Sequence, residues 1–150
     1  MQRLTPFLWF DTQAEEAARY YCSIFKNSSI GKILRYGDHG PGPKGSVMTI
    51  EFTLDGNRFV AINGGPQYKF TPATSFVVEC KDQAEIDHYW DKLTAGGMTQ
   101  PCGWLVDKYG LSWQVVPVDL VQLIEAPKAM QAMLKMTKFD IRELQDAARA

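Results

Sequence analysis

The sequence has few cysteines, few histidines and no excess of charge of either sign. Its 150 residues include three cysteines and two histidines, and 16 Lys and Arg face 17 Asp and Glu. Three cysteines are too few for a disulfide framework, so we expect reduced thiols in a cytoplasmic protein. The balanced charge argues against nucleic acid as a partner, because proteins that bind nucleic acid usually carry a basic excess.

Long hydrophobic runs are also missing. No run of about 18 apolar residues occurs, so we expect neither a membrane-spanning helix nor a membrane partner. The first residues, Met1 to Pro6, contain no apolar core and no small-residue cleavage site, so we expect no signal peptide. With 45% hydrophobic residues, the length fits one domain whose core needs neither disulfides nor metal ions.

The first 66 residues have the pattern of a βαβββ unit. An apolar, aromatic run at Phe7–Phe10 predicts a buried strand, and apolar residues at helical spacing follow from Ala14 to Phe25. Thr12 and Glu15 have the spacing of a helix capping box. Three further strands are predicted, over residues 30–36, 46–54 and 57–62.

The second half repeats this order. Ser75–Cys80 has the pattern of a strand, and Asp82 with Glu85 repeats the cap-and-acid spacing. Apolar residues at helical spacing follow, namely Ile86, Tyr89, Trp90 and Leu93. Three short strands are then predicted, over residues 98–102, 104–106 and 112–118. Two copies of one βαβββ unit are the simplest explanation of this order.

The C-terminal segment has a different, helical pattern. Pro127 stands where a helix can begin, a methionine-rich apolar stripe follows, and Asp140 can cap a final helix. Such a stripe serves core packing or contact with a partner more often than ligand binding. We therefore predict a single α+β domain over residues 1–150. Its parts are unit one over 1–66, unit two over 70–118 and a helical tail over 121–150.

Several segments resemble one known family. They are Phe70–Val78, Asp82–Asp87, Gly96-Gly97, Cys102-Gly103-Trp104-Leu105 with Asp107, Tyr109–Pro117 and, in the tail, Met133–Ile141. Together they resemble the PhnB-like branch of the glyoxalase/bleomycin-resistance (vicinal oxygen chelate) superfamily, often labelled 3-demethylubiquinone-9 3-methyltransferase-like. The resemblance covers nearly the whole chain. It implies tandem βαβββ units that form a curved mixed sheet around a pocket, followed by C-terminal helices, in a homodimer.

The resemblance also implies where a metal ion would be held. Metal-dependent members of the superfamily place His or Glu ligands on four strands, and those places fall here near Leu4, Asn63, Ser75 and Gln114. None of the four is a histidine or a carboxylate, so we expect no catalytic metal and no other cofactor. Glu79, on the same strand face as Ser75, supplies one carboxylate at most, and we expect both histidines, His39 and His88, at the surface.

Methyl transfer and catalysis by a cysteine nucleophile each require particular residues. The methyltransferase label requires a glycine-rich turn before a helix, whereas Gly37–Pro43 is interrupted by prolines and precedes a strand pattern. We expect that segment to be a mobile loop over a pocket mouth. Cys102 is the candidate nucleophile, with Lys108 near it in sequence, but a small residue filling a gap in the core fits the same pattern.

The leading hypothesis is a protein that binds a small, partly planar organic molecule without a catalytic metal. A metal-dependent lyase, isomerase or dioxygenase is the alternative, and the methyltransferase is a third. Aromatic side chains would supply stacking surface and polar ones would fix orientation, although core packing explains the aromatic residues equally well. The predicted ligand-binding residues are Trp9, Asn63, Phe70, Ser75, Glu79, Cys102, Trp104, Trp113 and Gln114.

Overall fold

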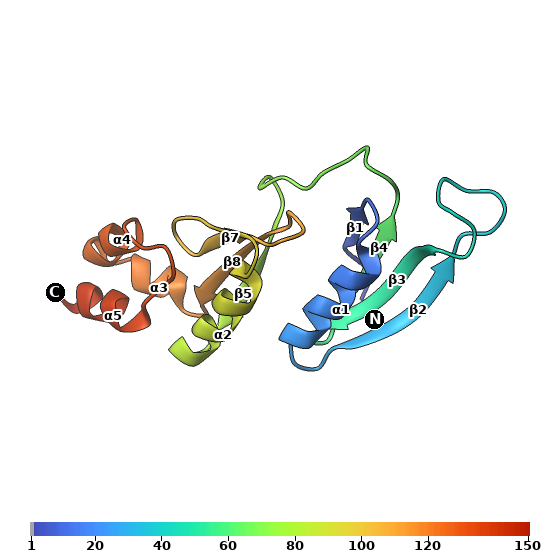
Figure 1. Cartoon of the computed structure of the whole chain (residues 1–150). Coiled ribbons are helices and arrows are strands. Elements are labelled where there is room, and N and C mark those ends of the chain that lie inside the picture. The colour runs from blue at the N-terminus through green and yellow to red at the C-terminus, as the bar shows by residue number, and fades with distance from the viewer. Residues whose placement is uncertain (1) are drawn as a thin grey trace. The chain divides into compact units, whose positions relative to one another are not determined.

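A computed structural model describes residues 2–150 of the chain. The chain divides into two compact units, the first ending at Phe70 and the second running over Thr71–Ala150 (Figure 1). Each unit contains one four-stranded mixed sheet. The predicted α+β class and the tandem βαβββ order are confirmed.

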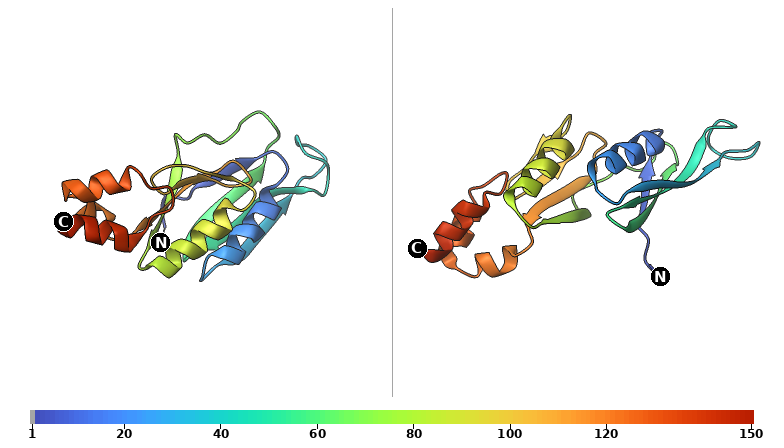
Figure 2. Two further views of the ribbon diagram at one scale, coloured as in Figure 1. Left: turned by 60° about the vertical axis from the view of Figure 1, so that its left-hand side comes forward. Right: turned by 90° about the horizontal axis from the view of Figure 1, so that it is seen from below.

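The first unit follows the predicted order of elements. They are β1 (Phe7–Phe10), α1 (Ala14–Ile24), β2 (Ser29–Arg35), β3 (Val47–Leu54) and β4 (Asn57–Asn63). The strands lie in the order β1-β4-β3-β2, with β1 parallel to β4 and the other neighbours antiparallel. Helix α1 covers one face of this sheet (Figure 2). Its small residues Ala14, Ala17 and Ala18 are fully buried, which lets the helix backbone approach the strands closely.

The start of α1 differs from the prediction. The N-cap residue is Gln13, and it makes no capping bond with its side chain, so the capping box predicted at Thr12 is wrong. Instead Asn63, at the end of β4, accepts a hydrogen bond from the backbone N–H of Ala14 at 2.8 Å. The same amide donates to the carbonyl oxygen of Val47 at 3.2 Å. A side chain distant in sequence therefore provides the hydrogen-bond acceptor for a backbone N–H group in the first turn of the helix.

We expect Asn63→Ala to lower the free energy of unfolding by about 2 kcal/mol, because it removes both a helix cap and a bond to β3. Urea unfolding followed by circular dichroism measures this loss. Thr12→Ala is the matched control, and it should change stability by less than about 0.5 kcal/mol. A loss at Thr12 equal to that at Asn63 would contradict the observed cap.

The glycine- and proline-rich loop packs around one aromatic ring. Tyr36 is buried, and a Cβ atom on Gly40 or Gly42 would lie 2.8 or 2.4 Å from the carbon atoms of its ring. The Tyr36 hydroxyl donates to the carbonyl oxygen of Asn63, and the N–H of Gly45 donates to that of Tyr36 at 2.8 Å. These contacts tie the loop to the core of the first unit, and the loop leads into β3 rather than into a helix.

The second unit repeats the topology of the first. Its elements are β5 (Ser75–Cys80), α2 (Gln83–Thr94), β6 (Met98–Thr99), β7 (Trp104–Val106) and β8 (Ser112–Pro117). The strands lie in the order β5-β8-β7-β6, again with the first pair parallel. Here the predicted cap is confirmed, since Asp82 accepts a hydrogen bond from the N–H of Glu85 at 2.9 Å. Helix α2 packs against β5, β7 and β8 on one face of the sheet.

The tail is helical, as predicted. It contains α3 (Leu120–Ile124), α4 (Pro127–Met133) and α5 (Ile141–Arg149), of which α3 was not predicted. Proline begins α4, and Asp140 caps α5 by accepting from the N–H of Glu143 at 2.9 Å. The three helices pack on one another beside one end of the second sheet (Figure 2). No helix among residues 2–150 is long and apolar enough to cross a membrane.

Specific hydrogen bonds attach the tail to the second unit. The backbone N–H groups of Cys102 and Gly103 donate to carbonyl oxygens of the segment between α4 and α5, at 2.9 and 2.8 Å. The amide of Gln83 donates to the carbonyl oxygen of Phe139 at 2.9 Å and accepts from the N–H of Ile141 at 2.8 Å. The tail is thus part of the second unit rather than a separate appendage.

Candidate functional site

The face of the second sheet opposite α2 is the strongest candidate site. Side chains alternate along a strand, and the register of the sheet places every second residue on this face. We call it the open face because Val77 and Met98 on it are 53% and 64% exposed. Its residues are Ser75, Val77, Glu79, Met98, Trp104, Val106, Ser112, Gln114 and Val116.

A row of polar side chains crosses the open face. Gln114 Nε2 donates to Ser75 Oγ at 3.0 Å, between the neighbouring strands β8 and β5. Ser112, paired with Ser75 in the register, is fully buried. Its hydroxyl is the one buried side-chain polar atom without a hydrogen-bond partner in the described part of the chain. We did not predict Ser112 as a site residue, although its spacing of two from Gln114 places both on one face.

Trp104 and Glu79 flank this polar row. Trp104 lies directly across from Gln114 on β7, and Glu79 lies on β5. Trp104 is half-buried and Glu79 is exposed. Within residues 2–150 neither the Trp104 indole nor the Glu79 carboxylate has a hydrogen-bond, ring or ion-pair partner. An aromatic surface and unpaired polar groups therefore adjoin on one sheet face.

Two predicted site residues of the second unit lie away from the open face. Trp113 is 3% exposed on the α2 side of the sheet, and its indole N–H donates to Asp107 Oδ2 at 2.9 Å. Cys102 lies in the loop before β7, where its thiol donates to the carbonyl oxygen of Met133 at 3.6 Å. Trp113 therefore packs in the core, and Cys102 contacts the tail.

The predicted site residues of the first unit have structural contacts. Trp9 lies on the sheet face away from α1, and its indole N–H donates to the carbonyl oxygen of Gly65 at 2.9 Å. Phe70 packs edge-on against buried Phe10, with ring centroids 5.2 Å apart. Asn63 caps α1. Each of these three residues therefore makes a different structural contact, and the contacts do not form one site.

The donor groups do not fit a divalent metal ion of the kind that the superfamily implies. Leu4 is 84% exposed and has no donor atom, and the Asn63 amide is used in two structural hydrogen bonds. Ser75 and Gln114 bond each other and are neutral ligands, which bind such ions poorly without a carboxylate or imidazole. No group of three or more His, Cys, Asp or Glu suited to a metal occurs among the described residues. His39 and His88 are exposed, as predicted.

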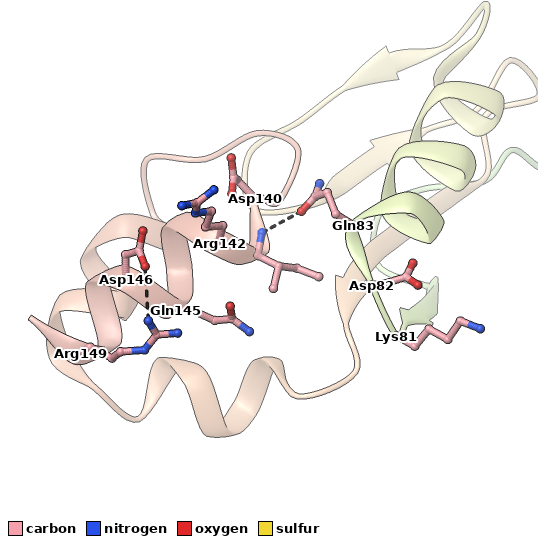
Figure 3. Close-up of a pocket in the computed structure, with 9 residues that line it drawn as sticks. Lys81, Asp82, Gln83, Asp140, Arg142, Gln145, Asp146 and Arg149 are labelled. Carbon is pink, nitrogen blue, oxygen red and sulfur yellow. Dashed lines mark hydrogen bonds and ion pairs between the residues drawn. The ribbon is translucent and has the colours of Figure 1, made fainter.

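A groove between α5 and the start of α2 is a second candidate (Figure 3). Its volume is about 680 Å³. Three cations and three carboxylates line it, so its charges balance. Asp82 and Asp140 are used as helix caps, and Arg149 pairs with Asp146 at 3.6 Å. The lining has no aromatic side chain, so the open face is the better site for a planar organic molecule.

The thiols of Cys80 and Cys22 are not suited to nucleophilic catalysis. Burial, and then the charges of Glu85 and Asp82, raise the pKa of Cys80 to about 12. Burial also raises the pKa of Cys22, against a smaller lowering by Arg19. A thiol reacts as the thiolate, and a raised pKa makes that form scarce near neutral pH.

We expect Cys80 in the native protein to resist alkylation by iodoacetamide at pH 8, where about one thiol in 10,000 would be ionised. Unfolding should restore the ordinary reactivity. Peptide mapping by mass spectrometry after timed labelling measures both rates, and a Cys80→Ala variant confirms the peptide assignment. Rapid labelling of native Cys80 would contradict the assignment of this thiol to the core.

Comparison with known proteins now identifies the family. A family model described as 3-demethylubiquinone-9 3-methyltransferase matches residues 2–116. The chain belongs to this family. The PhnB protein of Bacillus cereus is 40% identical, over 77% of this chain and 99% of that one, with a TM-score of 0.71. The predicted PhnB-like membership is thus confirmed, and the family match ends before the helices of the tail.

More distant structures show the fold alone. A Pseudomonas aeruginosa protein is 20% identical over 78% of this chain and 98% of its own, with a TM-score of 0.65. The fosfomycin resistance protein FosX from Listeria monocytogenes is 15% identical over 77% and 91%, with a TM-score of 0.52. These similarities confirm the glyoxalase/bleomycin-resistance fold. No curated protein matches the chain.

Proposed function

We propose that the protein binds a small, partly planar organic molecule on the open face, without a catalytic metal. The buried Ser112 hydroxyl without a partner, in a polar row beside the unpaired indole of Trp104, is the observation that carries the proposal. A planar ligand would stack on Trp104, while its polar atoms would bond Ser112 and Gln114. Such a combination of aromatic surface and a few convergent polar groups is typical of sites for small molecules.

Two activities suggested by the family and superfamily names have less support. Methyl transfer requires a site for a methyl donor, but the glycine-rich loop packs around Tyr36 and leads into β3. A metal-dependent lyase, isomerase or dioxygenase requires ligands that the open face lacks. Isothermal titration calorimetry with S-adenosylmethionine tests the first, and metal analysis of protein purified without a chelating tag tests the second. Tight stoichiometric binding in either would overturn the proposal.

We also propose that the protein is a homodimer in the cytoplasm. All three cysteines are free, which suits a reducing compartment. Leu4 and Phe7 in the first unit are large apolar residues that are more than half exposed, and a partner copy would bury such surface. Native mass spectrometry measures the assembly state, and a strict monomer at micromolar concentration would contradict the dimer.

We expect Trp104→Leu to weaken ligand binding, because leucine keeps apolar volume and removes the aromatic surface. Small molecules released from purified protein by denaturation are identified by mass spectrometry, and the recovered compound is then titrated back. We expect affinity to fall about tenfold, because stacking is lost. Tyr68→Leu, at a 69% exposed aromatic residue of the first unit, is the matched control. Equal affinities in the two variants would place the ligand elsewhere.

A further inference from the structure

The open face of the second sheet carries one charged side chain. Among its nine residues only Glu79 has an acidic or basic side chain. We propose that the molecule bound on this face is a planar organic cation, such as an aromatic ring that carries a protonated or quaternary amine. The inference rests on the proposed binding function and adds the charge of the ligand to it.

The surroundings of Glu79 leave its carboxylate uncompensated. Its neighbours on the open face are Val77, two residues before it on β5, and Val116, its partner in the register. Lys81 follows it in the chain but lies beyond the end of β5 and lines the groove beside α5. Glu79 makes no ion pair within the part of the chain that the structure describes. An approaching cation is thus attracted without first displacing another.

The corresponding face of the first sheet shows the opposite arrangement. Glu51 on β3 and Arg58 on β4 form an ion pair and a hydrogen bond there. This carboxylate is already neutralised by its own unit, so it offers no free charge to a ligand. The unpaired charge is a property of the second unit, where the polar row and Trp104 also lie.

The remaining groups of the open face also suit a cation. The π face of an indole attracts organic cations within about 6 Å of the ring centroid. Gln114 donates its amide N–H to Ser75, which leaves Gln114 Oε1 as an acceptor beside Trp104. A ligand N–H group would donate to this oxygen, and the ring of the ligand would stack on the indole. A carboxylate or sulfonate in that position would meet an acceptor and a like charge.

Two fluorescent probes of opposite charge test the inference. Thioflavin T is a planar cation, and 8-anilinonaphthalene-1-sulfonate is an aromatic anion. We expect the cation to bind the full-length protein, with an affinity roughly five- to tenfold weaker in Glu79→Gln and falling as salt is raised. Glu125→Gln, which makes the same change of charge at an exposed position after α3, is the control and should bind as the unaltered protein does.

The probes and variants distinguish a preference for cations from ligand binding on the open face in general. If both probes bind equally and weaken in Trp104→Leu but not in Glu79→Gln, the open face binds ligands without a preference for cations, and the inference is wrong. If neither probe binds, or Trp104→Leu changes nothing, the proposed function and the inference fail together. Stronger binding of the anion would also overturn the inference.

Discussion

Asp107→Asn is expected to lower the free energy of unfolding by about 3 kcal/mol. Asp107 is 2% exposed and accepts at least three hydrogen bonds. Its Oδ1 accepts from the backbone N–H groups of Tyr109 and Leu111, at 2.8 and 3.1 Å, and its Oδ2 accepts from the indole of Trp113 at 2.9 Å. An asparagine has one acceptor oxygen and turns an N–H₂ group toward a remaining donor. Bonds to a buried charged group contribute about 1.5–3 kcal/mol each.

This carboxylate also positions the candidate site. Asp107 holds the turn between β7 and β8, the two strands that carry Trp104 and Gln114. Asp107→Asn should therefore also lower ligand affinity, because it disturbs the alignment of the two strands that carry Trp104 and Gln114. Urea unfolding measures stability, and Asp119→Asn is the control because Asp119 is exposed and makes no capping bond with its side chain. A difference of less than 1 kcal/mol between the two variants would contradict the bonding observed.

Sequence patterns predict both βαβββ units because the signals are local. Alternating apolar residues mark the strands, and Asp82 and Asp140 cap the helices that they precede. The prediction at Thr12 fails for a physical reason. The Asn63 side chain reaches the start of α1 from the neighbouring strand, through a register that pairs Phe10 with Asn63. Such a contact between distant parts of the chain cannot be predicted from the residues around the start of the helix.

The candidate site is predictable only in part, and strand alternation explains which part. Ser75, Glu79, Trp104 and Gln114 share the open face, as the period of two allows. Trp113 is next to Gln114, so the same period places it on the α2 side. Cys102 has a positive φ of 61° in a loop bonded to the tail, a placement that follows from long-range contacts. Its neighbours could not be inferred from residues near it in sequence.

Phe139→Ala is expected to lower the free energy of unfolding by about 3–5 kcal/mol, the range for removing a buried aromatic ring. Phe139 is 1% exposed and lies in the segment between α4 and α5. Its ring lies against Gly103, where a Cβ atom would be 2.5 Å from the ring carbon Cε2. Its carbonyl oxygen accepts from Gln83. Loss of the ring leaves a cavity at the point where the tail joins the second unit.

The same variant shows whether the tail is an integral part of the second unit. The family match ends at residue 116, and the Bacillus cereus protein covers 77% of this chain while 99% of its own length is matched. If the tail were a separate addition, Phe139→Ala would release it and leave the unfolding of the sheet unchanged. The contacts with Gly103 and Gln83 predict instead that denaturant unfolding shifts as a whole. Leu134→Ala, at a 62% exposed position of the tail, should change stability by less than about 1 kcal/mol. Equal losses in the two variants, or a tail that proteases remove without loss of stability, would contradict an integral tail.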